Sequence, residues 1–437
     1  MLLHFRLTLE NRGSQAGVIP LYADAMQRHQ AWNPKSLADT TLAPTSPVQI
    51  GRHEPSDDEF QSRMLEEVSR TFALTIPQLP ADLARVVANA YLLCRIVDTI
   101  EDEPRLSAAS KRELCEHFVG AISGSESPER FSSTLAPRLS SQTSTAAHDL
   151  IRETRRVLGI THRFTQSQQE ALRACVGIMG QGMVHFQERG SARGLDDLAE
   201  LGRYCYHVAG VVGEMLTRLF CEYSPAIAAN RDALMLLSVS FGQGLQMTNI
   251  LKDIWEDRAR GFCWLPRDQF ADPDFDLEHL APGIARGTFE RGVLRLVAVT
   301  HGHLCNALRY TLLIPAQETG IRNFCLWALG MAVLTLRKIH RRPDFSSGEE
   351  VKISRRSVKA TVAVSRFAAG HDLALRALFR LASMGLPSVP ADPLMLSQGT
   401  KPDEPLRQTS ALEQVDRVDE PIEHPKRVPL ARQRADG

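Results

Sequence analysis

The residues best suited to chemistry lie between Gly242 and Asp257, a stretch that reads GQGLQMTNILKDIWED. If this stretch is helical, one face presents amides and carboxylates at three- and four-residue steps: Gln246, Asn249, Asp253 and Asp257. The opposite side is largely apolar, with Phe241, Leu245, Ile250 and Ile254. Such a helix packs its apolar side into a core and presents hard oxygen ligands to a cavity.

A second acidic cluster occurs earlier in the chain, between Arg95 and Asp102. Asp98 and Asp102 are four residues apart and Glu101 precedes the latter, so the pattern Asp-x-x-Glu-Asp occurs in both stretches. One such motif alone is equally well explained by a solvated helix face. Two matching motifs in apolar helical runs, each followed by arginine, indicate a site for divalent metal ions and a diphosphate.

Mg²⁺ is the ion that this pattern favours. Diphosphate is a poor leaving group until its charge is neutralised, and Mg²⁺ neutralises it while keeping several of its own waters. Because each ion binds few protein carboxylates, several carboxylates must converge from different helices. We expect the metal site to comprise Asp98, Glu101, Asp102, Asn249, Asp253 and Asp257, with Glu101 supporting the direct ligands.

Three further side chains are candidates with open alternatives. Arg95 lies three residues before Asp98 and either pairs with it or reaches a phosphate. Arg70 sits at a polar break before a helical pattern, where it faces an anion or solvent. Tyr204, at the head of a glycine-containing helix, is either a core residue or an aromatic ring that stabilises a carbocation.

The composition excludes several classes of protein. The 437 residues include 51 Lys plus Arg and 51 Asp plus Glu, so no general attraction to nucleic acid is expected. Eight cysteines occur without a C-x-x-C pair, which argues against zinc and disulfide frameworks and favours a cytosolic setting. No apolar run is long enough to span a bilayer, so we expect a soluble or peripherally membrane-bound protein.

The elements that must position these residues are almost all helical. From about residue 56 to 385 apolar residues recur at helical spacing between short Gly, Pro and Ser breaks, which predicts one large all-α domain. Residues 1–55 are predicted to be a loosely attached extension and 386–437 a disordered tail. The helix from Leu198 to Phe220 contains Gly210 and Gly213, which predict close approach of a neighbouring helix or a ligand.

Taken together, these motifs resemble the squalene and phytoene synthase family, the head-to-head prenyl transferases. The matching segments cover roughly residues 60 to 345 and come in the family's order: Ser69 to Phe72, Leu93 to Asp102, Tyr204 to Gly213 continuing to Arg218-Leu219-Phe220, and Gln246 to Asp257 continuing to Trp264-Leu265-Pro266. The wording of Asp98 to Asp102 and of the stretch from Phe324 to Ala332 is similar to the squalene synthase branch.

Two departures from the family pattern stand out. Lys252 replaces the arginine usual before the second aspartate motif, which keeps the charge but loses the bidentate fork. Val351-Lys352-Ile353 resembles the segment implicated in nicotinamide cofactor binding, but Ser354 follows where a basic residue is usual, and Arg355 is displaced. The resemblance therefore supports condensation more strongly than reduction.

The resemblance implies an all-helical isoprenoid synthase fold around one central cavity. Two farnesyl diphosphates would condense with Mg²⁺ to presqualene diphosphate, which NADPH would reduce to squalene. By the resemblance Asp98, Asp253 and Tyr204 are catalytic, Tyr204 in the first half-reaction. Arg70, Arg95, Lys252 and Arg258 would bind substrate, and Lys352 and Arg355 the NADPH. The protein would act as a monomer, with possible peripheral membrane contact and no nucleic-acid partner.

Other functions stay open at this point. A related synthase of C30 or C40 products, such as dehydrosqualene, hydroxysqualene or phytoene, would use the same metal chemistry without NADPH. A non-catalytic relative would be expected to lose aspartates, and this chain keeps Asp98, Asp102, Asp253 and Asp257. A head-to-tail chain elongator or a terpene cyclase would share the metal site but not the motif from Tyr204 to Phe220.

Overall fold

The computed structural model describes residues 55–69, 71–282, 286–387 and 389, and these residues fold as helices joined by short connections. They contain no β-strand, only isolated bridges between Leu195 and Pro266 and between Asp272 and Phe275. The all-α prediction is thus confirmed. The predicted N-terminal extension falls outside the described residues except for its last position, and the predicted tail does so except for residues 386, 387 and 389.

The first part of the chain forms α2 (Asp57–Val68), α3 (Phe72–Thr75), η2 (Ile76–Gln78), α4 (Ala81–Asp102), α5 (Ala108–Ile122), α6 (Pro128–Leu135), η3 (Ala136–Arg138), α7 (Thr145–Arg152), α8 (Thr154–Thr161) and α9 (Gln166–Arg189). The middle forms α10 (Leu198–Cys205), the π-helix η4 (Tyr206–Gly210), α11 (Val211–Tyr223), α12 (Pro225–Ala228), α13 (Arg231–Lys252) and α14 (Ile254–Ala259). The last part forms η5 (Arg267–Phe270), η6 (Leu277–His279), α15 (Arg286–Leu313), α16 (Thr319–Arg341), α17 (Gly348–Val351), α18 (Arg355–Ala368) and α19 (Asp372–Ala382).

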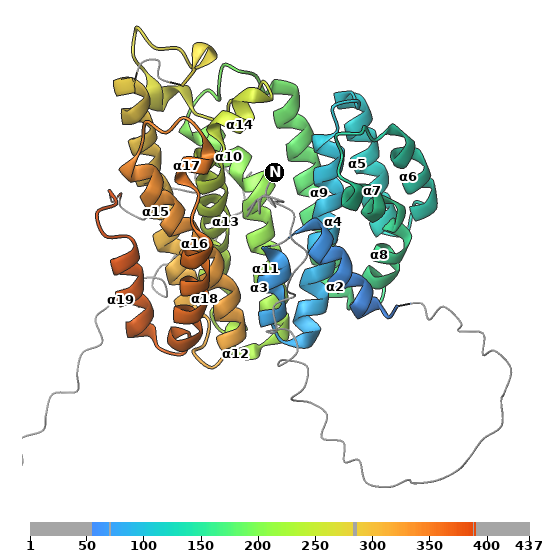
Figure 1. Ribbon diagram of the computed structural model, residues 1–437. Coiled ribbons are helices and arrows are strands. Elements are labelled where there is room, and N and C mark those ends of the chain that lie inside the picture. The colour runs from blue at the N-terminus through green and yellow to red at the C-terminus, as the bar shows by residue number, and fades with distance from the viewer. Residues whose placement is uncertain (1–54, 70, 283–285, 388, 390–437) are drawn as a thin grey trace, which may run out of the picture.

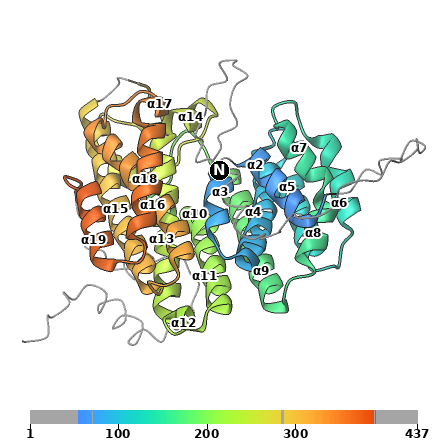
Figure 2. The same cartoon turned by 60° about the horizontal axis from the view of Figure 1, so that its bottom comes forward.

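The helices form two groups that share one core. In Figure 1 and Figure 2, α2 and α4–α8 lie on one side and α15–α19 on the other, with α9, α10 and α11 between them. Helix α4 packs against α2, α8 and α9, whereas α13 packs against α11, α15 and α16. Both α4 and α13 bury most of their residues on all sides, as expected for central helices. The first acidic motif therefore ends one central helix, α4, and the second begins at the end of the other, α13, and continues into α14.

Two helices expected to be continuous are interrupted. The stretch from Gly242 to Asp257 breaks at Asp253, whose φ of −101° and ψ of 17° separate α13 from α14. Backbone hydrogen bonds still connect the two helices, because Asp253 N donates to Asn249 O at 2.8 Å and Asp257 N to Asp253 O at 2.9 Å. The helix expected from Leu198 to Phe220 is likewise divided by the π-helix η4 and continues to Tyr223.

Two glycines permit close contact between helix backbones. A Cβ atom on Gly213 would lie 2.2 Å from the Ser238 carbonyl oxygen, and one on Gly242 would lie 2.3 Å from the Ala209 carbonyl oxygen. These distances are far below van der Waals contact, so no larger residue fits without moving a helix. Of the two alternatives that the sequence leaves open, the structure therefore supports close helix packing at Gly213.

From the sequence no apolar run long enough to span a bilayer is expected, but one described helix, α16, is long and apolar enough to cross a membrane. Its most apolar stretch is 72% buried inside the protein, where it packs against α13, α15 and α18. Length and composition alone do not distinguish a buried core helix from a membrane span. The packing of α16 is that of a core helix.

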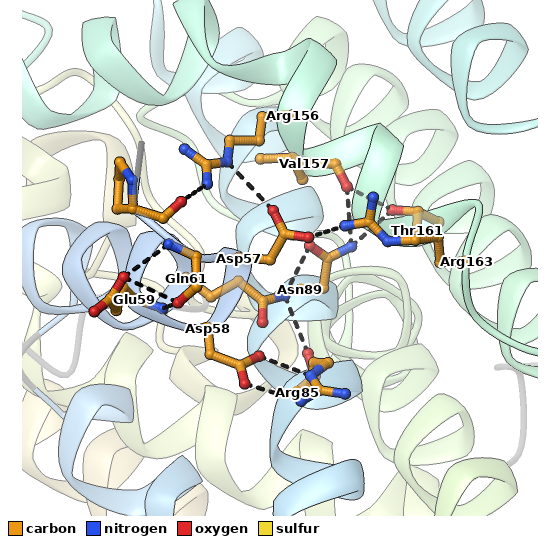
Figure 3. Close-up of polar contacts among 12 residues, drawn as sticks. Asp57, Asp58, Glu59, Gln61, Arg85, Asn89, Arg156, Val157, Thr161 and Arg163 are labelled. Carbon is orange, nitrogen blue, oxygen red and sulfur yellow. Dashed lines mark hydrogen bonds and ion pairs between the residues drawn. The ribbon is translucent and has the colours of Figure 1, made fainter. Parts of the chain in front are cut away.

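A buried polar junction fastens α2 and α8 to α4 (Figure 3). Asn89 on α4 is fully buried, accepts from Gln61 Nε2 at 3.1 Å and donates to Thr161 Oγ1 at 2.7 Å. Its amide also donates to the Val157 carbonyl at 3.3 Å. Because a buried polar group is costly unless it is hydrogen-bonded, this set of contacts fixes how the three helices pack.

Asn89→Ala should lower the free energy of unfolding by about 2–3 kcal/mol, because it removes three hydrogen bonds and leaves buried partners behind. Urea unfolding followed by circular dichroism measures this change. The matched control is Asp58→Asn, which weakens the exposed pair between Asp58 and Arg85 and should cost less than about 1 kcal/mol. Equal effects of the two substitutions would show that the junction is not what holds these helices.

Candidate active site

Residues from both acidic motifs line one cavity of about 680 Å³. Glu101 and Asp102 reach it from the end of α4, and Asp257 reaches it from α14. The other lining residues come from α4, α5, α7, α9 and α14 and from the loops after α4, η3 and α14: Arg95, Thr99, Pro104, Lys111, Gln142, Thr143, Ser144, Ala147, Gln187, Ala259, Arg260, Phe262 and Trp264. Motifs about 150 positions apart in sequence are thus brought to the same cavity.

Two of the three acidic side chains at the cavity, Glu101 and Asp257, are buried. Burial and the neighbouring Asp253 carboxyl together raise the pKa of Asp257 to about 7. Burial likewise raises the pKa of Glu101, together with Asp102 and Asp98. Both carboxyl groups would be more easily ionised next to a cation.

The available oxygen atoms fit a hard divalent cation. Glu101 Oε2 and Asn249 Oδ1 are buried and accept no hydrogen bond from the protein. Carboxylate and amide oxygens of this kind are the ligands that Mg²⁺ prefers. Among the described residues, however, no three His, Cys, Asp or Glu side chains stand together in a ready arrangement for a metal ion. An ion here would complete its coordination with water or with oxygens of a bound anion.

Of the six predicted metal ligands, Asp98, Asn249 and Asp253 do not line this cavity, and both aspartates lie beside a basic side chain. Asp98 is fully buried, and Arg95 Nη1 donates to its Oδ2 at 3.5 Å. Lys252 Nζ donates to both carboxylate oxygens of Asp253, at 2.6 and 2.7 Å. The sequence left open whether Arg95 pairs with Asp98 or faces a phosphate. In the structure Arg95 pairs with Asp98 and also lines the cavity, so both alternatives are compatible with its position.

The arginine of the second motif that reaches the cavity is Arg260. Arg258, expected to bind substrate, instead donates to the carbonyl oxygens of Ala192 at 2.7 Å, Glu278 at 2.9 Å and Leu280 at 3.1 Å. Its guanidinium group therefore holds connecting segments together. Arg70, the other predicted arginine, lies outside the described residues.

An aromatic stack leads from Tyr204 to the cavity wall. The fully buried Tyr204 ring stacks on Trp264 with centroids 4.2 Å apart, and Trp264 stacks on Phe262 at 5.6 Å. Burial raises the pKa of Tyr204 well above its usual value, and the Glu101 and Asp257 carboxyls raise it further. The phenol therefore stays protonated, and carboxyl groups of both acidic motifs influence its pKa.

The residues expected to bind a nicotinamide cofactor lie elsewhere. Lys352 Nζ donates to Glu349 Oε1 at 2.9 Å and Oε2 at 3.2 Å, and Arg355 is exposed in the first turn of α18. Neither residue lines the cavity that contains the acidic motifs. In the described part of the chain, the two side chains therefore do not form one site with the acidic cavity.

Comparison with known sequences assigns the family. The sequence model of the family named squalene/phytoene synthase matches residues 65–357, which is well over half of the chain. This chain belongs to the squalene/phytoene synthase family. The matched region includes every motif residue named above, and it confirms the resemblance seen in the sequence.

Curated members of the squalene/phytoene synthase family are similar over much of the chain. Squalene synthase BSS of Botryococcus braunii is 28% identical over 319 residues, covering 70% of this chain and 64% of that relative. Squalene synthase ERG9 of Candida albicans is 27% identical over 309 residues, covering 69% of this chain and 66% of that relative. The chain thus spans about two thirds of the length of these relatives.

Solved structures of the family share the fold. TcSQS in complex with the ligand BPH1237 aligns with a TM-score of 0.61 and 22% identity, covering 79% of this chain and 97% of that one. A dehydrosqualene synthase in complex with a ligand aligns with a TM-score of 0.51 and 20% identity, covering 71% of this chain and 95% of that one. The fold is therefore the all-α isoprenoid synthase fold that the sequence predicted.

Lys111 is a functional candidate in this member of the squalene/phytoene synthase family that sequence reasoning missed. Its ammonium group is buried in the cavity wall, donates to the Glu101 carbonyl oxygen and to Gln187, and has its pKa lowered by burial. Gln187 Nε2 donates to the same carbonyl at 2.8 Å. The available signal was the position of Lys111 on the stripe formed by Leu114, Cys115 and Phe118, where an apolar residue is expected.

Mg²⁺ and inorganic diphosphate, added together at about 100 times their Kd, should raise the melting temperature by several degrees, because a ligand at that concentration adds about 2.7 kcal/mol. Asp257→Asn should remove most of this rise, since it takes a carboxylate out of the cavity. Asp274→Asn, which changes an exposed carboxylate outside the cavity lining, should leave it unchanged. Differential scanning fluorimetry measures all three. A full rise in Asp257→Asn would contradict a role for this carboxylate in cation binding.

Proposed function

We propose that this chain is a squalene synthase. It would condense two farnesyl diphosphates head to head through presqualene diphosphate and reduce this intermediate to squalene with NADPH. The observation that supports the proposal most directly is the meeting of Glu101 and Asp102 with Asp257 at one cavity that also contains Arg95 and Arg260. The curated relatives named squalene synthase support the same reaction.

The first step that the site must promote is departure of diphosphate from an allylic carbon. In this proposal Asp98, Asp102, Asn249, Asp253 and Asp257 hold Mg²⁺ with support from Glu101. Mg²⁺ bound there supplies the positive charge that makes diphosphate a better leaving group.

Basic side chains assist the same departure. Arg95, Lys111 and Arg260 face the cavity and would stabilise the diphosphate through charge-assisted hydrogen bonds. Lys252, which pairs with Asp253, would turn to the diphosphate when Asp253 takes up a cation. Arg70 is a further proposed diphosphate contact, whereas Arg258 would act through the segments that it holds together.

The aromatic stack suits the cation that forms after diphosphate leaves. Phe262 and Trp264 line the cavity, and their π faces stabilise positive charge without reacting with it. Tyr204 is proposed to act in the first half-reaction; its ring stacks on Trp264 of the cavity wall, and its phenol stays protonated because burial raises its pKa. The cation must also be kept from water, which would otherwise capture it.

The reductive step is the part of the proposal with a specific rival. NADPH would supply hydride, and Lys352 with Arg355 is proposed to bind it. Lys352 is held by Glu349, and both residues lie away from the acidic cavity. This geometry favours, as a second candidate, a related C30 or C40 synthase that releases a dehydrogenated or hydroxylated product without NADPH. Retention of the four motif aspartates argues against a non-catalytic relative.

Incubation of the purified chain with farnesyl diphosphate and Mg²⁺, with and without NADPH, distinguishes these functions. Mass spectrometry should identify squalene only when NADPH is present, because hydride is needed to complete the reaction. A C30 product formed equally well without NADPH would support the second candidate. If neither mixture released diphosphate, both candidate functions would be contradicted.

Asp98→Asn and Asp253→Asn should each lower turnover by about 100-fold or more, because each removes a charge that the leaving diphosphate depends on. Diphosphate release measured by a coupled assay gives the rates, and unchanged melting temperatures show that the fold is intact. Asp274→Asn is the matched control and should keep normal turnover, because its carboxylate is exposed away from the cavity. Normal rates in either motif variant would mean that these carboxylates do not act in the reaction.

A further inference from the structure

The surface of α18, α19 and the turn that follows them is unusually apolar. We call residues 355–384 the C-terminal hairpin. Of the seven large apolar side chains that the described residues expose, five belong to it. Phe367 is 86% exposed, Leu373 67%, Leu381 61% and Met384 62%, and Val364 is the fifth. Large apolar side chains gathered in this way commonly mark a binding surface.

These side chains follow the helical repeat on both helices of the C-terminal hairpin. Ala360, Val364 and Phe367 recur at four- and three-residue steps along the exposed side of α18. Leu373, Ala377 and Leu381 recur at four-residue steps along the exposed side of α19. A largely apolar groove of about 420 Å³ separates the two helices above α16. The hairpin thus offers two parallel apolar ridges with a groove between them.

The charge of the C-terminal hairpin is one-sided, although the whole chain has a formal net charge of zero. Its basic residues are Arg355, Arg356, Lys359, Arg366, Arg376 and Arg380, and all but Arg376 are exposed. Its single acid, Asp372, pairs with Arg322 Nη1 at 2.7 Å. Exposed basic side chains therefore flank the apolar ridges, and the one acidic side chain among them, which is 45% exposed, is paired with Arg322.

We propose that the C-terminal hairpin is a docking surface for an anionic lipid bilayer. Phe367, Leu373 and Leu381 enter the boundary between headgroups and acyl chains, while Lys359 and Arg380 contact lipid phosphates. Helices with one apolar and one basic side bind membranes in this way, lying in the plane of the interface. Helix α19 lies at the edge of the molecule in both Figure 1 and Figure 2, so a flat bilayer can reach it.

The charge pattern favours lipid over a protein partner. A protein interface in this position would be expected to deplete charge around its apolar centre and to offer specific pockets. Here the apolar side chains project from two ridges, and basic residues occur along their whole length. The proposal rests on this surface alone and does not depend on the reaction catalysed at the acidic cavity.

Vesicle sedimentation with the full chain tests the proposal. Vesicles that contain phosphatidylglycerol should bind the protein at least about tenfold more tightly than vesicles of phosphatidylcholine alone, because each basic residue near an anionic surface contributes. Binding should fall sharply at about 0.5 M salt, where the charges are screened. Binding that is weak and equal for both vesicles would overturn the proposal.

Matched variants assign the binding to this surface. Phe367→Glu and Leu373→Glu should each lower the affinity for phosphatidylglycerol vesicles about tenfold or more, and Lys359→Glu with Arg380→Glu should remove the preference for anionic lipid. Tyr223→Glu, at an exposed aromatic on α11, is the control and should bind as the original chain does. All these positions are exposed, so melting temperatures should not change.

Two outcomes would contradict membrane docking by the C-terminal hairpin. Original affinity in both Phe367→Glu and Leu373→Glu would show that the C-terminal hairpin is not the docking surface. Dimers in sedimentation equilibrium that Phe367→Glu converts to monomers, without vesicle binding by either, would show that a second copy covers it. Farnesyl diphosphate turnover in detergent-free solution is measured alongside, so loss of docking and loss of activity are told apart.

Discussion

The structure depends on one constraint, which is that two acidic side chains are buried on opposite sides of one cavity. Burial raises the pKa values of Glu101 and Asp257, so their charged forms are costly without a cation. The fold accommodates them by placing Lys111 and Gln187 at the end of α4 and Lys252 beside Asp253. Rigid central helices are needed to hold such groups in place, and both α4 and α13 are buried on nearly every side.

Sequence patterns predicted the fold class because it depends on local periodicity, and the meeting of the two motifs was expected because a diphosphate site needs carboxylates from different helices. The Asp-x-x-Glu-Asp spacing places its carboxylates on one helical face whatever the rest of the chain does. Apolar residues at helical spacing likewise predicted helices throughout the described core. The identity of the fold then followed from the order of motifs, which the family match confirms.

What the sequence could not predict depends on long-range contacts. Arg258 and Arg260 are equivalent in a pattern, and only the tertiary structure shows that Arg258 binds three carbonyls while Arg260 faces the cavity. The stacking of Tyr204 on Trp264 joins α10 to the segment after α14, which are far apart in the sequence, so no periodicity indicates it. The interruption at Asp253 is invisible for the same reason, since every residue around it is compatible with a helix.

The π-helix at Tyr206–Gly210 has a consequence for how this protein tolerates changes in chain length. A π-helical turn accommodates an extra residue relative to an α-helical one, and each residue of an α-helix advances about 100° around the axis. Loss of one residue between Tyr206 and Gly210 would leave a regular helix. It would also rotate Tyr204 away from Trp264 relative to the tight contact of Gly213 with Ser238. A deletion that makes the local helix regular would thereby remove the ring that supports Trp264 in the cavity wall.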